Sequence, residues 1–149
     1  MAFSTASDVE SYTQINFDSS LETHLTNNLI PFVDAAIEQY VGYTLSHGTK
    51  SETFTGDQTK EIFLRHLPVH SITSVVEDDI TLTEGNQKDF VFYDSGRLRR
   101  LGKRWSYARE KNIVVTYVSG YTAFGGGLST DLPIQIKMVS SRAAARLLE

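Results

Sequence analysis

The spacing of apolar residues along this chain of 149 residues changes at Gly42. Upstream of that glycine, apolar side chains recur every four positions, at Leu21, Leu25, Leu29, Val33, Ile37 and Val41. This spacing predicts an amphipathic helix over 18–42, with Ser19 and Glu22 as a capping box and Gly42 as its left-handed end. Because Pro31 lies inside the stretch, we expect a kink there, or two shorter helices that meet near 28–30.

Downstream of Gly42, apolar residues occur in short β-branched or aromatic runs that turn-forming residues separate. The runs are KSETFT, KEIFLRHL, SITSVV, DFVFY, RLRRL and NIVVTYV, and the turns include GDQ and DSG. We therefore expect residues 49–119 to be β-rich and to form a small, mostly antiparallel sheet.

The last segment, DLPIQIKMVSSRAAARLLE, returns to helical spacing and predicts a C-terminal helix over 131–149. Asp131 is expected to cap it, and Pro133 fits its first turn. The helix has a wide apolar surface and ends without glycine or proline, and its charges before Glu149 are Lys137, Arg142 and Arg146. We expect its last turn either to fray or to dock on another surface.

These elements predict an α+β fold in one domain. A kinked N-terminal helix or helix pair packs on the sheet, and the C-terminal helix follows a glycine-rich hinge at Gly125, Gly126 and Gly127. Residues 1–17 are expected to be flexible or peripheral. The chain has no cysteine, no run of apolar residues long enough to span a membrane and no leader-like start, so we expect neither disulfides nor a membrane segment.

The three glycines also raise the question of phosphate binding, because glycine-rich loops before helices cradle phosphates. Gly120 and Gly125 have P-loop spacing, but Gly126 and Gly127 stand where that motif needs lysine and a hydroxyl residue. The preceding strand belongs to an antiparallel series and not to a βαβ unit. A hinge is therefore the favoured interpretation, and we expect no nucleotide cofactor.

The sequence contains no recognisable catalytic or metal-binding motif. His66 and His70 are four residues apart, but Pro68 between them favours extended chain, in which they would not converge on a metal. The acidic run 77–79 lacks the alternation of a calcium loop. We therefore predict a protein that is not an enzyme and that holds no metal or cofactor.

Charge is distributed unevenly along the chain. Residues 1–96 contain 4 Lys and Arg against 15 Asp and Glu, whereas residues 97–149 contain 10 against 3. The basic part is densest over 97–111, where Trp105 and Tyr107 lie among the cations Arg97, Arg99, Arg100, Lys103, Arg104, Arg109 and Lys111. This stretch fits a nucleic-acid surface, a strand edge protected from aggregation, or a contact with the acidic part of a second copy.

Several stretches in succession resemble the head-tail connector (adaptor) proteins of long-tailed bacteriophages. They are LIPFVDAAIEQYVGYTL, EIFLRHLPVHSITSVV, DFVFYDSGRLRRLGKRW, IVVTYVSGY and DLPIQIKMVSSRAAARLL, and they cover residues 29–148 in the order of the family. The chain departs from the family in its long glycine loop before Leu132 and in its abrupt end.

The resemblance implies a single connector domain that forms a ring, with twelve-fold symmetry expected, in the neck of the virion. Such a ring joins the portal protein to the tail or a stopper protein and extends the channel for double-stranded DNA, after assembly in the host cytoplasm. It also implies that the last helix docks on the portal, and the residues expected there are Lys137, Arg142, Arg146, Leu147 and Leu148.

The basic stretch is expected at a subunit interface or near the DNA. A channel lined with repeated cations would grip DNA that has to slide, so we expect the stretch to face mostly a neighbouring subunit or the portal. The residues concerned are Arg97, Arg99, Arg100, Lys103, Arg104, Trp105, Arg109 and Lys111. The alternative function is a monomeric nucleic-acid-binding module with a basic patch.

Overall fold

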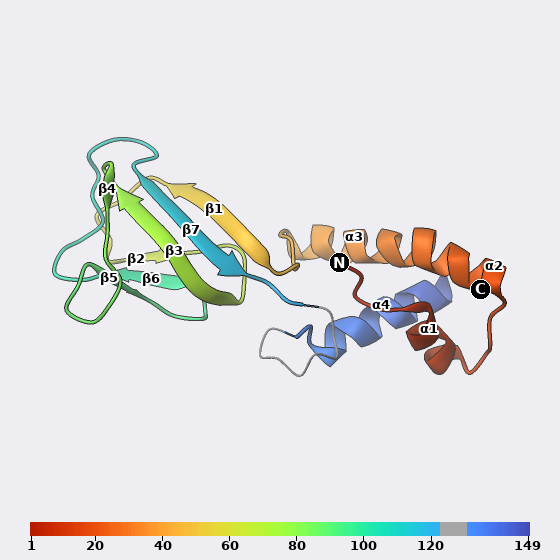
Figure 1. Cartoon of the computed structure of the whole chain (residues 1–149). Helices are drawn as coiled ribbons and strands as arrows, with labels where there is room; N and C mark the ends of the chain where they lie inside the picture. Colours follow the sequence, from red (N-terminus) through yellow and green to blue (C-terminus); the bar gives the residue numbers. More distant parts are fainter. Residues whose placement is uncertain (123–130) are drawn as a thin grey trace. The chain divides into compact units, whose positions relative to one another are not determined.

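A computed structural model describes residues 1–122 and 131–149 of the chain. Contacts within the chain divide it into two compact units. One unit comprises Met1–Thr44 and Tyr121–Glu149 and is helical, and the other comprises Leu45–Gly120 and is built from strands (Figure 1). The predicted class, with N-terminal helices, antiparallel strands and a C-terminal helix, is confirmed.

The described helical unit contains α1 (Ala6–Thr13), α2 (Ser19–His24), the π-helical segment η1 (Leu25–Leu29), α3 (Ile30–Val41) and α4 (Ile134–Arg146). The expected disturbance near 28–30 takes the form of η1, in which the Ile30 N–H donates to the Leu25 carbonyl, five residues back. Pro31 stands in the first turn of α3. A proline cannot donate to the carbonyl four residues earlier, and a π-helical turn accommodates that loss.

The helix ends differ in detail from the sequence prediction. Asp18 caps α2 by accepting from the Leu21 N–H at 2.8 Å, where Ser19 was expected. Gly42 ends α3 with φ 86°, as predicted. Pro133 precedes α4 without a side-chain cap, while the expected cap Asp131 instead accepts from the Thr122 hydroxyl at 3.2 Å.

The N-terminal residues are part of the helical unit, contrary to the expectation that 1–17 is flexible or peripheral. Thr5 and Asp8 form a capping box at the start of α1, and both Phe3 and Val9 are buried. The Phe3 N–H donates to Asp34 Oδ2 on α3 at 2.8 Å. Apolar periodicity did not indicate this helix, because α1 has only eight residues and a single buried apolar side chain.

Helix α4 has a core partner on one face. Its buried face consists of small residues, Ser140, Ser141, Ala144 and Ala145. The two alanines pack in a cluster with Val9, Leu25, Ile30 and Val33 from the other helices. Small side chains let helices approach closely, so α4 is held by α1 and α3 while its larger apolar residues remain outside.

The strands form two antiparallel sheets, where the sequence indicated one. The first contains β1 (Gly48–Phe54), β3 (Val69–Glu77), β4 (Ile80–Thr81) and β7 (Ile113–Ser119), in the order β1-β7-β3-β4. The second contains β2 (Glu61–Phe63), β5 (Phe90–Phe92) and β6 (Arg97–Arg100), in the order β2-β6-β5. The DSG turn joins β5 and β6 as expected, whereas β1 and β2, on either side of GDQ, belong to different sheets.

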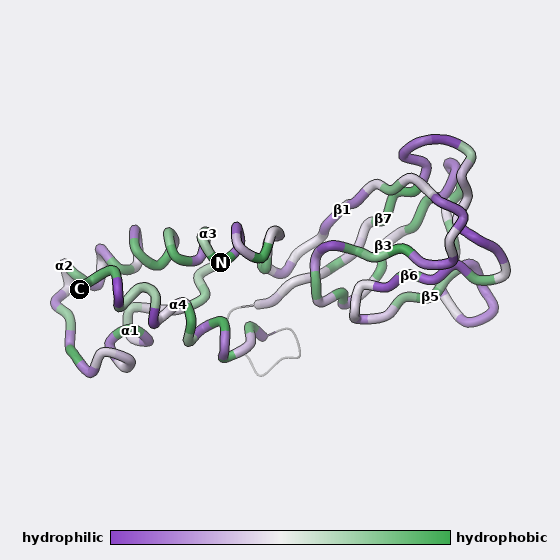
Figure 2. Tube along the Cα trace, turned by 180° about the vertical axis from the view of Figure 1, so that it is seen from behind, coloured by the Kyte–Doolittle hydropathy of each residue, from purple (hydrophilic) through white to green (hydrophobic). Residues whose placement is uncertain are grey.

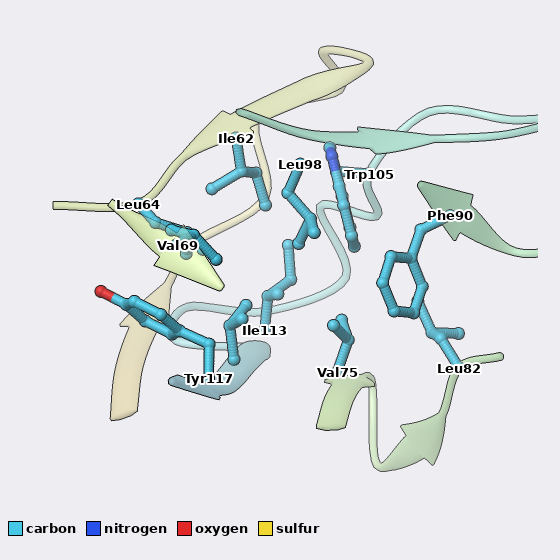
Figure 3. Packing of buried hydrophobic residues seen from close by; sticks show 11 residues of the cluster. Ile62, Leu64, Val69, Val75, Leu82, Phe90, Leu98, Trp105, Ile113 and Tyr117 are labelled. Atoms are coloured by element: carbon cyan, nitrogen blue, oxygen red, sulfur yellow. The ribbon is translucent and has the colours of Figure 1, made fainter. Parts of the chain in front are cut away.

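Side chains from both sheets make one core in the strand unit. Figure 3 shows Trp105 and Phe90 pointing into it beside Leu98, Ile113 and Val75. Burial alternates along β7, because every second residue of a strand faces the same side and one side of this strand faces the core.

Candidate interaction surfaces

An apolar groove lies between α3 and α4 of the helical unit. We call it the α3–α4 groove, and its lining residues are Phe32, Val33, Ala36, Ile37, Tyr40, Val139, Ala143 and Leu147. Hydrophobic colouring recurs along α3 in Figure 2. Apart from the hydroxyl of Tyr40, none of the lining side chains is polar, so the groove offers an apolar partner almost no competition from water-binding groups.

The groove arises from residue spacing on the two helices. Phe32, Ala36 and Tyr40 follow one another at intervals of four on α3, and Val139, Ala143 and Leu147 do so on α4. Residues at this spacing share one face of a helix. They stand beside the buried face and not in it, so Phe32 is 66% exposed and Tyr40 is 92% exposed.

The cationic residues of α4 are not equivalent. Lys137 Nζ lies 2.8 Å from Asp8 Oδ1 on α1, so this charge already has a partner within the unit. Burial raises the pKa of the Asp8 carboxyl, but hydrogen bonds from Lys137 and Thr5 outweigh it and leave the pKa below its ordinary value. Arg142 and Arg146 are exposed.

The five residues predicted to meet the portal therefore separate into two groups. Leu147, Arg142 and Arg146 form the exposed group, and Leu147 also lines the groove. Leu148 packs partly against the helical core. Lys137 is paired. The predicted hinge glycines, Gly125, Gly126 and Gly127, lie outside the described residues.

Two central residues of the basic stretch 97–111 are buried and cannot contact a nucleic acid. Arg100 is 4% exposed, and its Nε and Nη2 donate to Glu77 Oε1 at 3.3 and 3.2 Å. Trp105 is 0% exposed and lies in the core of the strand unit. A ring buried in this way cannot stack on a base, which corrects the interpretation of Trp105 as a stacking residue.

Most of the remaining cations are matched within their own unit. Lys103 Nζ lies 3.6 Å from Glu77 Oε1, and Arg109 Nη2 lies 2.5 Å from Asp79 Oδ2. Arg97 Nη1 lies 3.5 Å from Glu61 Oε1, and Arg97 Cζ lies 4.0 Å from the centre of the Tyr93 ring. Arg104 Nη1 donates to the Gln58 carbonyl at 3.1 Å. The acidic run 77–79 thus holds basic side chains in place.

Arg97 and Arg99 lie on the opposite face of β6 from the buried Leu98 and Arg100. Arg99 pairs in register with Glu61 of β2 and with Val91 of β5. This outer face is half-exposed, and the other cations of the stretch that reach the surface are Lys103, Arg104, Arg109 and Lys111.

His66 and His70 of the strand unit have hydrogen-bond partners within that unit. His66 Nδ1 lies 3.1 Å from both Glu52 Oε1 and the Tyr117 hydroxyl, and that hydroxyl also donates to Glu52. Burial raises the pKa of the Glu52 carboxyl, but hydrogen bonds from Tyr117, the Arg65 N–H and His66 leave it below its ordinary value. His70 Nε2 lies 2.7 Å from the Gly120 carbonyl.

Within residues 1–122 and 131–149, no three His, Asp or Glu side chains come together as a group that could hold a metal. Of the helices that these ranges contain, none has the length and apolarity to cross a membrane.

A comparison with protein families assigns residues 2–139 to the head completion protein family (HCP). The chain belongs to this family. The assignment covers most of the chain, and it confirms the resemblance to head-tail connector proteins that the succession of motifs indicated.

Two solved structures have a similar fold. One is described as the neck of a native gene transfer agent (GTA) particle computed with C12 symmetry, with 16% sequence identity and a TM-score of 0.59 over 96% of this chain and 78% of that chain. The other is the neck of an empty GTA particle computed with C6 symmetry, with 18% identity and a TM-score of 0.65 over 95% and 75%. No curated protein shows significant similarity to the chain.

Proposed function

We propose that this head completion protein is a structural component of a phage neck, where copies of it form a ring. The ring joins the portal to the tail or to a stopper protein and extends the channel through which double-stranded DNA passes. Family membership carries the proposal, and the similar folds found in necks of C12 and C6 symmetry support a ring. Twelve copies is the expected number.

The structure supports an adhesive role more than a chemical one. The helical unit is already folded on its own core, yet it exposes large apolar side chains on α3 and α4. Monomeric proteins rarely expose such surfaces without a partner. We therefore assign the chain no enzymatic reaction and no cofactor.

The proposed portal contact is the end of α4. Arg146 and Leu147 are exposed in its last turn and carry the contact together with Arg142, whereas Leu148 and Lys137 contribute mainly through their own unit. The proposed role of the basic stretch is at a subunit interface, through the outer face of β6 with Arg97 and Arg99. DNA slides past without sequence-specific binding.

The second candidate, a monomeric nucleic-acid-binding module, has less support. Its aromatic stacking residue and one of its central arginines are buried, and four of the other cations face carboxylates or a carbonyl of the same chain. Neutralised cations release few counterions on binding a phosphate backbone. Tight, strongly salt-dependent binding of DNA by the isolated monomer would favour this alternative.

Imaging of intact particles tests the proposal. An antibody against the chain is expected to label one point on each particle, where the head meets the tail. Particles that lack the chain, or that carry the label elsewhere, would contradict a neck function.

A further inference from the structure

The helical unit exposes a second apolar patch in addition to the α3–α4 groove. Tyr12 on α1 lines a shallow depression with Ile134 and Met138 of α4, and Ile15 follows in the turn between α1 and α2. All four side chains are at least half exposed, with Tyr12 at 51% and Ile15 at 59%. We call this surface the α1 patch.

The two patches use different faces of α4. The groove takes Val139, Ala143 and Leu147, whereas the α1 patch takes Ile134 and Met138. An interface in which the same patch meets itself gives a two-fold pair, but two different patches that meet head to tail generate a ring if the rotation closes. One folded unit with two separate apolar patches is what a ring of identical subunits needs.

Carboxylates outnumber cations near the α1 patch, where Lys137 is paired with Asp8 and Arg146 lines a depression with Tyr12 and Ile15. Residues 1–44, which include Tyr12, Ile15 and the α3 side of the groove, contain six Asp and Glu and no Lys or Arg. Within that range Glu10, Asp18 and Glu22 lie close in sequence to the α1 patch. On α4, the exposed Arg142 stands three residues after Val139 and therefore beside the groove.

We infer that the α3–α4 groove of one copy receives the turn between α1 and α2 of the next copy, with Tyr12 and Ile15 as its apolar anchors. Tyr40 and Phe32, the most exposed residues of the groove, would then be covered in the ring. The acidic surroundings of the turn face Arg142, and such complementarity fixes which patches meet. The inference rests on the proposed ring, and it assigns Arg142 to the subunit interface and Arg146 to the portal, while Leu147, which lines the groove at the end of α4, borders both contacts.

Single cysteines test the contact directly, because the chain has none of its own. Particles are assembled with a mixture of Tyr12→Cys and Tyr40→Cys chains and then oxidised mildly. A head-to-tail contact predicts mixed dimers in this preparation and no dimers with either variant alone. Chains that carry both substitutions are expected to give a ladder of disulfide-linked multimers, which Arg142→Glu should largely abolish.

A matched control uses Tyr12→Cys with Tyr107→Cys, since Tyr107 is also well exposed but belongs to the strand unit. This mixture should give no mixed dimers. Neck-bound protein in which the Tyr12 and Tyr40 cysteines do not cross-link would overturn the inference and leave the neck function standing. Homodimers of the Tyr40→Cys variant alone, or a portal segment cross-linked to Tyr40→Cys, would overturn it as well. Absence of the native chain from particles would reject the proposed function and the inference together.

Discussion

Asp34 is a buried residue whose carboxyl makes hydrogen bonds with two other segments of the helical unit. Its carboxyl lies in α3 and is 6% exposed, and it accepts from the Phe3 N–H and from the Ser140 hydroxyl of α4, each at 2.8 Å. Ser140 in turn meets the Ser4 hydroxyl at 2.8 Å. Three segments that are distant in sequence are therefore joined by one buried polar network.

Replacing Ser140 by alanine removes a hydrogen bond from a buried carboxylate. An unsatisfied buried group costs about 1–3 kcal/mol, so we expect Ser140→Ala to lower the free energy of unfolding by that amount in urea denaturation. Ser141→Ala is the control, because Ser141 is also buried but donates only to the Lys137 carbonyl of its own helix. Equal effects of the two substitutions would contradict a special role for the Asp34 network.

The same carboxyl predicts a pH dependence. Burial raises the pKa of Asp34 above its ordinary value of 3.8, although hydrogen bonds from Phe3 and Ser140 lower it in part. The folded state therefore binds the proton more tightly than the unfolded state, and the stability that this group contributes is present below pH 3.8 and lost as pH rises through the raised pKa.

Other carboxyls, such as Asp8, have lowered pKa values, so the stability that they contribute increases as pH rises. The contribution of Asp34 is therefore isolated by comparing two proteins at each pH. The stability of the native chain minus that of Asp34→Asn, measured from pH 3 upward, should fall as pH rises. A difference that grows with pH would show that the carboxylate stabilises the fold.

At the scale of elements, β6 separates the buried Arg100 from the half-buried Arg99. Arg100→Glu would place a second carboxylate beside Glu77 in a buried site, which is expected to cost about 3–5 kcal/mol of stability. Arg99→Glu lies on the outer face and should change stability by no more than about 0.5 kcal/mol. Thermal and urea unfolding of both variants provide the check, and similar losses would contradict the assigned faces.

The portal contact of α4 is tested better by substitutions than by a truncation, because the end of the helix also belongs to the helical core. Removal of residues 143–149 would take Ala144 and Ala145 out of the helical core, so we expect the shortened chain to lose much of its helical unit. Arg146→Glu combined with Leu147→Asp changes only exposed side chains and should leave the melting temperature unchanged. Particles made with this double variant are expected to lack joined tails, and normal joining would contradict the portal contact.

These elements also show what sequence reasoning could reach. The four-residue spacing before Gly42 and the alternation in β7 predicted their elements, because each pattern is local and repeated. The division into two sheets was not predictable, since β1 pairs with β7 and β2 with β6, and no local signal encodes such distant pairing. Likewise, the density of cations over 97–111 gave no indication that Arg100 and Trp105 turn inward to Glu77 and the core.

The apolar stripe of the groove on α3 could have been predicted from the sequence. Phe32, Ala36 and Tyr40 form a second stripe beside the buried one, at the same four-residue spacing. The burial of α4 through small residues was missed because serine and alanine carry little hydrophobic signal, although they allow the closest helix packing.

For the whole molecule, the account depends on one claim, that this chain supplies shape and adhesive surface to a ring at the neck. A cryo-electron microscopy reconstruction of the neck in particles that contain the chain tests it most directly. The account predicts a closed ring of copies between portal and tail, with the end of α4 against the portal and Tyr40 covered by the neighbouring copy. A neck whose density contains no copy of the chain, or a single copy outside any ring, would contradict it.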